Sequence, residues 1–205
     1  MATEPRIKGL DTKSLLAQTI QTIANPEIIS QNFGDIPDAV ARSVFRHSAE
    51  LGVQSADEIN VDKNGSNTCV AASLEYDMAS TSPAEFARFA AALSSDDYMV
   101  TKEMPLEQIA GSKEDSLWVL QNFNIPYEET ENGTVKINIS PDRNAIIRAR
   151  VQTSYQDEGE RSALDVLMQS AFMNVGSQHT YNSLNDTREV GTFSDAQDRT
   201  GLGSL

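Results

Sequence analysis

Apolar residues recur at helical spacing in several stretches of the chain. The stretch Ser14–Ile23 has a short pattern of this kind that ends near Asn25-Pro26, where the proline disfavours further helix. Residues 35–52 predict a second helix, in which Asp35 can cap the start and Gly52 can close the end. His47 falls on the apolar stripe of that helix, so we interpret it as a core histidine.

The strongest helical signals lie between residues 69 and 93. The stripe Val70, Ala71, Leu74 and Met78 predicts a helix over 69–79, with Cys69 in its first turn. Ser82-Pro-Ala-Glu85 matches a capping box with proline in the first helical position. The apolar residues behind it predict a second helix with one buried face: Phe86, Phe89, Ala90 and Leu93.

Beyond Ser95 the pattern is mixed. Residues 98–101 predict a short strand, residues 113–122 a helix, and residues 134–139 an alternating strand after the turn Glu131-Asn-Gly. Residues 145–151 fit a strand or a helix, and their β-branched content favours the strand. Residues 160–175 predict a helix whose apolar face is so broad that only a core could cover it.

These elements predict an α+β fold, with a helix-rich lobe and a small antiparallel sheet. The 205 residues, 39% of them hydrophobic, suffice for one domain with a sizeable core. We expect a flexible N-terminus over residues 1–12, a single α+β domain over residues 13–176, and a polar tail over residues 177–205 that forms a hairpin or is disordered.

The charge of the chain restricts its partners. Sixteen basic and 30 acidic residues give a net charge of −14, which repels nucleic acids and anionic membranes. No apolar stretch approaches the roughly 20 residues of a membrane helix, and no secretion signal is visible. We therefore expect a soluble protein, cytoplasmic or exported without a visible signal peptide, that acts on a protein or peptide, with a basic one favoured by charge.

Cys69 is the only cysteine, and it lies where a polar loop enters a helix, in NGSNTCVAASLE. A thiol attacks as the thiolate, and the unpaired N–H groups at a helix start favour that negative charge. The same N–H groups can stabilise the oxyanion that forms when an acyl group is attacked. We therefore interpret Cys69 as a nucleophile, against the alternative of a small buried hydrophobe. One cysteine and two histidines are a poor zinc set, so we expect neither a metal nor another cofactor.

The stretch Asn67-Thr-Cys-Val-Ala-Ala-Ser-Leu resembles the nucleophile helix of papain-like cysteine peptidases of bacteria, over roughly residues 60–95. The segment from Ser82 to Arg88 is similar to what accompanies that cysteine in large secreted or effector proteins. The resemblance implies a lobe of helices and a lobe of antiparallel strands that carries a catalytic histidine. It also implies a glutamine a few residues before the cysteine as oxyanion donor, a place where this chain offers only Asn64 or Asn67.

By its order in the chain, His179 is the candidate base, because the family's histidine follows the cysteine. Its alternative is a surface histidine just past a helix C-terminus. The candidates for a residue that orients the base are Asn182, Asn185, Asp186 and Asp195, of which we select Asp195. The ending Gly-Leu-Gly-Ser-Leu is compatible with a longer protein whose base lies beyond Leu205.

The sequence thus favours a thiol hydrolase, a peptidase or amidase with Cys69 as nucleophile. Two alternatives stay open: a non-enzymatic helical interaction module, and the incomplete front part of a longer bacterial secreted or effector protein.

Overall fold

A computed structural model describes residues 9–32, 68–122, 124–155, 159–177, 179–184 and 186–188. Helices and strands are mixed in this part of the chain, which confirms the predicted α+β class. The helices are α1 (Thr12–Ala24), the 3₁₀ turn η1 (Pro26–Ile28), α3 (Cys69–Thr81), α4 (Pro83–Leu93), α5 (Glu107–Ala110), α6 (Lys113–Asn122), α7 (Ala145–Tyr155) and α8 (Ala163–Gly176). The strands are β1 (Val100–Pro105), β2 (Tyr127–Glu129), β3 (Thr134–Ile139), β4 (Tyr181–Asn182) and β5 (Thr187–Arg188).

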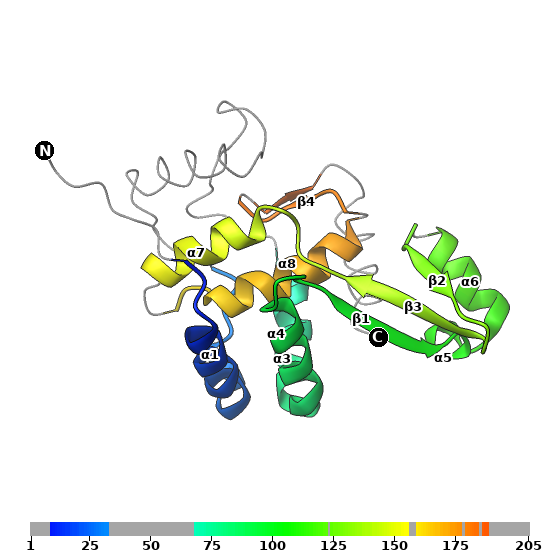
Figure 1. Cartoon of the computed structure of the whole chain (residues 1–205), viewed down its shortest axis with the longest axis horizontal. Coiled ribbons are helices and arrows are strands. Elements are labelled where there is room, and N and C mark those ends of the chain that lie inside the picture. Colours follow the sequence, from blue (N-terminus) through cyan, green and yellow to red (C-terminus); the bar gives the residue numbers. More distant parts are fainter. Residues whose placement is uncertain are drawn as a thin grey trace, which may run out of the picture.

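Helix α8 is the centre of the molecule. It contacts α1, α3, α4, α7 and β4, and every one of its residues is buried (Figure 1). A helix that is covered on all sides must be apolar or must satisfy its polar groups inside the protein. The larger apolar side chains of α8 join the main core cluster, whereas its polar side chains form hydrogen bonds to neighbouring segments.

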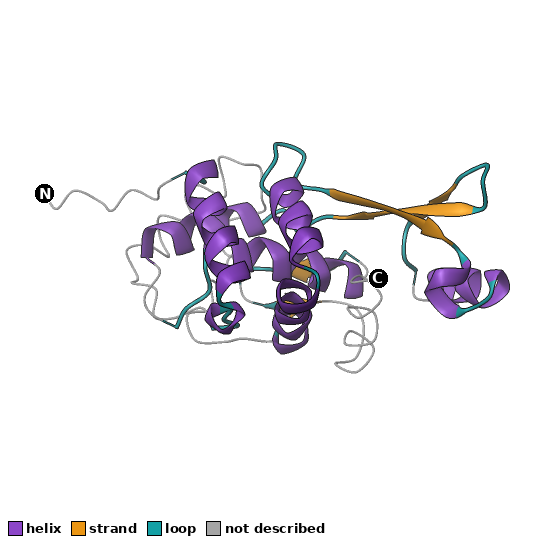
Figure 2. Ribbon diagram, turned by 90° about the horizontal axis from the view of Figure 1, so that it is seen from below, coloured by secondary structure: helices purple, strands orange, loops and turns teal. Residues whose placement is uncertain are grey.

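The sheet extends away from the helices. Strands β1 and β3 run outward, and β2, α5 and α6 lie at the far end (Figures 1 and 2). The strand order is β1-β3-β2, with both pairs antiparallel. Val135, Ile137 and Ile139 are buried in alternation along β3, as the period-two pattern predicts.

Residues 145–151, for which the sequence favours a strand, are helical, so that prediction is wrong. They belong to α7, which packs against α8. Ala145, Arg148, Ala149 and Gln152 are all buried and share one helical face. Packing of this face on α8 outweighs the β propensity of the two isoleucines and the valine, because β propensity depends strongly on context.

The predicted capping box at Ser82 does not form. Ser82 ends α3 as well as starting α4, and its N–H already donates to the Met78 carbonyl at 2.9 Å. The Glu85 carboxylate instead forms a bidentate hydrogen-bonded pair with Arg88, at 2.7 and 2.8 Å. A capping box that the sequence analysis missed lies at the start of α8, where Ser162 and Asp165 each accept a hydrogen bond from the other's backbone N–H.

The expected polar tail contains a short hairpin in its described part. Strands β4 and β5 pair antiparallel, and Tyr181 and Leu184 are buried. Asp186, also buried, accepts hydrogen bonds from Arg161 and Tyr181, which attaches this hairpin to the segment before α8. In the ranges that the structure covers, no helix combines the length and the apolar character needed to span a membrane.

Candidate functional site

Cys69 is the first residue of α3, and its thiol is exposed and free. The prediction that it lies in the first helical turn is confirmed, and the alternative of a buried hydrophobe is wrong. Thr68 is the N-cap residue, but its side chain makes no capping hydrogen bond to the helix. Among the described residues, no side chain caps the backbone N–H groups in the first turn of α3.

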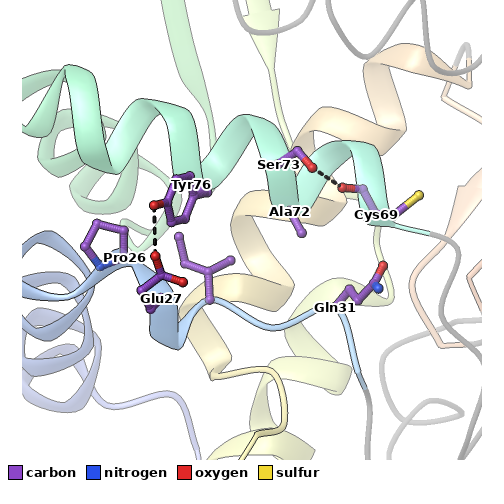
Figure 3. A pocket seen from close by; sticks show the side chains of 8 residues that line it. Pro26, Glu27, Gln31, Cys69, Ala72, Ser73 and Tyr76 are labelled. Carbon is purple, nitrogen blue, oxygen red and sulfur yellow. Dashed lines mark hydrogen bonds between the residues drawn. The ribbon is translucent and has the colours of Figure 1, made fainter.

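A pocket of about 360 Å³ opens next to this helix start (Figure 3). One wall is α3, and the opposite wall is η1 with the residues that follow it. Figure 3 shows Cys69 and Gln31 at one end of the pocket, while Tyr76 donates a hydrogen bond to Glu27 at 3.0 Å at the other end. The lining residues are Pro26, Glu27, Ile29, Gln31, Cys69, Ala72, Ser73 and Tyr76.

Gln31 is a site residue that the sequence analysis missed. The resemblance to papain-like peptidases asks for a glutamine just before the cysteine, but Gln31 lies 38 residues upstream, in a segment without a strong pattern of its own. Only the fold brings its side-chain amide into the same pocket as Cys69. A primary amide can donate to an oxyanion, so the pocket lining combines a cysteine with a hydrogen-bond donor.

Two buried carboxyl groups lie behind the pocket. Glu75 of α3 and Asp165 of α8 are both buried. Burial raises the pKa of Glu75 well above its ordinary value, and the neighbouring Asp165 raises it further. Burial also raises the pKa of Asp165 to about 6, against the lowering effect of hydrogen bonds from Ser162 and Ser30. The predicted apolar stripe of α3 did not include Glu75, whose place in the core is a second feature that the sequence analysis missed.

His179 does not line the Cys69 pocket. It follows the end of α8, has a left-handed backbone with φ of 63°, and lies with Nδ1 3.3 Å from the Asn174 amide nitrogen. Partial burial lowers the pKa of its imidazole. Asn174 is five residues beyond Gln169, which contacts Thr68, and five residues correspond to about 7.5 Å along a helix axis. The hydrogen bonds of His179 and of Thr68 are therefore formed with different turns of α8.

The other predicted site residues lie outside the described part of the chain. They are Asn64, Asn67 and Asp195, together with Asn185 among the alternatives. The predicted helix over residues 35–52, with its core histidine His47, also lies outside the described residues. The strands of the described three-stranded sheet carry no histidine, in contrast to the lobe that the papain-like resemblance implies. Within the ranges described above, no three His, Cys, Asp or Glu side chains gather as metal ligands.

No protein-family model matches this chain, and no significant similarity to a curated protein or to a solved structure is found. The function of the protein must therefore be inferred from the chemistry of the Cys69 pocket.

Proposed function

We propose that the protein is a thiol hydrolase that cleaves peptide or amide bonds, with Cys69 as nucleophile and Gln31 as oxyanion donor. The observation that carries the proposal is the exposed Cys69 at the first position of α3, which lines a pocket together with Gln31. The likeness of residues 67–74 to the nucleophile helix of papain-like peptidases supports the same chemistry.

The first step of the reaction requires a nucleophile and a hydrogen-bond donor for the oxyanion, and the residues of the pocket offer both. The Cys69 sulfur attacks the carbonyl carbon, the carbonyl π bond opens, and the negative charge moves to the oxygen. The Gln31 amide and the first-turn N–H groups of α3 donate hydrogen bonds to that oxygen. Collapse of the intermediate breaks the bond from carbon to nitrogen and leaves a thioester, and the leaving amine takes up the proton that the thiol gave up. Water then hydrolyses the thioester, which releases the acid and restores the thiol.

His179 stays the sequence-based candidate for the base, with Asp195 as its orienting partner. His179→Ala tests this assignment. Loss of hydrolysis without loss of stability would support His179 as the base, whereas unchanged hydrolysis would exclude that role.

Alkylation of the thiol tests the proposal directly. We expect iodoacetamide to label Cys69 faster than free cysteine, because the N–H groups at the start of α3 can stabilise the negative charge on the attacking sulfur. We also expect Cys69→Ala to abolish hydrolysis of a fluorogenic peptide mixture while the thermal midpoint stays close to that of the wild type. Labelling at or below the rate of free cysteine would contradict the proposal.

A groove between α1 and α4 favours the interaction module as second candidate. It has a volume of about 540 Å³, and its lining includes Leu15, Leu16 and Ala90. Leu16 is 60% exposed. This candidate predicts that Leu16→Glu abolishes partner binding and that Cys69→Ser does not.

A further inference from the structure

A buried glutamine of α8 reaches both walls of the Cys69 pocket. The side chain of Gln169 is fully buried. Its Nε2 donates to the Ser30 carbonyl at 2.9 Å and to Glu75 Oε2 at 3.0 Å, and its Oε1 accepts from the Thr68 hydroxyl at 2.8 Å. Ser30 directly precedes Gln31, and Thr68 directly precedes Cys69. The side-chain amide of Gln169 therefore contacts both the residue before Gln31 and the residue before Cys69.

The direction of these hydrogen bonds is fixed by chemistry. A backbone carbonyl can only accept, so the amide nitrogen of Gln169 must face Ser30. A guanidinium can only donate, so Thr68 accepts from Arg161 and gives its own proton to Gln169. Arg161 is held in turn by the carboxylate of Asp186, at 2.9 and 3.3 Å. The chain of donors thus runs one way, from Arg161 through Thr68 and Gln169 to the Ser30 carbonyl.

This arrangement has two consequences for the pocket. The Thr68 hydroxyl points to Gln169 and makes no capping hydrogen bond to α3, so Thr68 itself does not occupy the first-turn N–H groups. Ser30 is held at both of its backbone groups by α8, because its N–H also donates to Asp165 Oδ2 at 3.4 Å. The backbone that presents Gln31 is thereby fixed relative to the start of α3.

We propose that Gln169 is a positioning residue, which sets Gln31 and the first turn of α3 against each other by holding Ser30 and Thr68. The inference rests on the proposed hydrolase function. Gln169 itself does not line the pocket and acts only through these neighbours.

The test uses the full chain and a reversible probe of the oxyanion site, the aldehyde N-acetylglycinal. Addition forms the bond from sulfur to carbon and opens the carbonyl π bond, and the thiol proton ends on the oxygen. We compare Gln169→Met and Thr68→Val with Thr68→Ser, which keeps the hydroxyl. We expect the first two variants to weaken the adduct roughly tenfold or more, and Thr68→Ser to bind it as tightly as the wild type does.

Iodoacetamide labelling distinguishes a positioning role of Gln169 from a purely structural one. Alkylation forms no oxyanion, so it does not depend on how the oxyanion donors are placed. Positioning predicts labelling of Gln169→Met and Thr68→Val within about threefold of the wild-type rate, whereas a general loosening changes adduct and labelling together. The matched control is Ser170→Ala, which removes another buried hydrogen-bonding side chain of α8, one that donates to Asp142 Oδ1 at 2.6 Å. This control should leave the adduct unchanged. If Gln169→Met does not fold, the two Thr68 variants carry the test.

The outcomes separate the two proposals. If the wild-type protein forms no aldehyde adduct, the hydrolase function fails, and the positioning role fails with it. If the wild type forms the adduct and Thr68→Val or Gln169→Met binds it equally tightly, only the positioning role of Gln169 fails. A loss of adduct affinity of the same size in Ser170→Ala would also overturn it.

Discussion

Gln31 and Cys69 illustrate how two ordinary residues become a candidate site. The position of Cys69 at a helix start follows from the local pattern, since a polar loop there meets an apolar stripe. The place of Gln31 in the same pocket could not be predicted in this way, because no local pattern connects residues on two separate segments. The direction of the Thr68 hydroxyl was likewise not predictable, since it depends on Arg161 and Gln169, which lie about a hundred residues further along the chain.

Replacement of Gln31 by alanine tests its role as oxyanion donor. We expect kcat for peptide hydrolysis to fall by roughly 10²–10³, with KM nearly unchanged, because the lost hydrogen bond forms only in the transition state. Steady-state kinetics on a fluorogenic peptide measures both constants. The control is Gln21→Ala, since Gln21 lines the neighbouring pocket with Glu27 and is absent from the lining of the Cys69 pocket. A similar loss in both variants would remove Gln31 from the proposal.

At the scale of elements, the periodic segments were predicted well. The helix at 113–122 has the predicted bounds, and the strand at 134–139 alternates as expected. The helix α7 was predicted as a strand because a short apolar run is ambiguous until its partner is known. Here the partner is α8, whose surface accepts a helical face.

The two serines that precede helices give a prediction at this scale. We expect Ser162→Ala to lower the free energy of unfolding by about 1 kcal/mol, because its side chain caps α8. Ser82→Ala should change it by less than about 0.5 kcal/mol, because the Ser82 side chain makes no capping hydrogen bond. Urea unfolding of the two variants in parallel measures the difference. An equal loss of unfolding free energy in both variants would show that the capping hydrogen bond does not decide how much each serine contributes to stability.

At the scale of the whole molecule, Glu75 and Asp165 make stability depend on pH. Their raised pKa values mean that the folded chain holds protons that the unfolded chain releases. The contribution of Asp165 is therefore fully present below about pH 4 and is lost as the pH rises through about 6, and Glu75 acts in the same direction. For Asp165, whose pKa rises from 3.8 to about 6, the loss is on the order of 3 kcal/mol.

Urea unfolding at several pH values between about 4 and 8 checks this expectation. Glu75→Gln should flatten the profile, since a neutral amide neither titrates nor repels the Asp165 carboxylate. A variant profile parallel to that of the wild type would mean that another group causes the pH dependence.

The charge of the chain gives a prediction about substrates. With a net charge of −14, we expect kcat/KM for a peptide containing lysine to fall severalfold between low salt and about 1 M salt, where the Debye length is about 3 Å. A neutral peptide of the same length should change little. Equal salt dependence of the two peptides would dismiss the preference for basic substrates.

The sequence by itself determined the α+β class, most helices and the place of Cys69 at a helix start, because these depend on neighbours within one or two turns. Only the tertiary structure decided that residues 145–155 are helical, that Ser162 rather than Ser82 forms a capping box, and that Gln31 lies beside Cys69. These outcomes depend on which groups α8 brings together. The polar groups of a fully buried helix must form hydrogen bonds with segments that lie far apart in the chain. The local spacing of residues contains no information about such pairs.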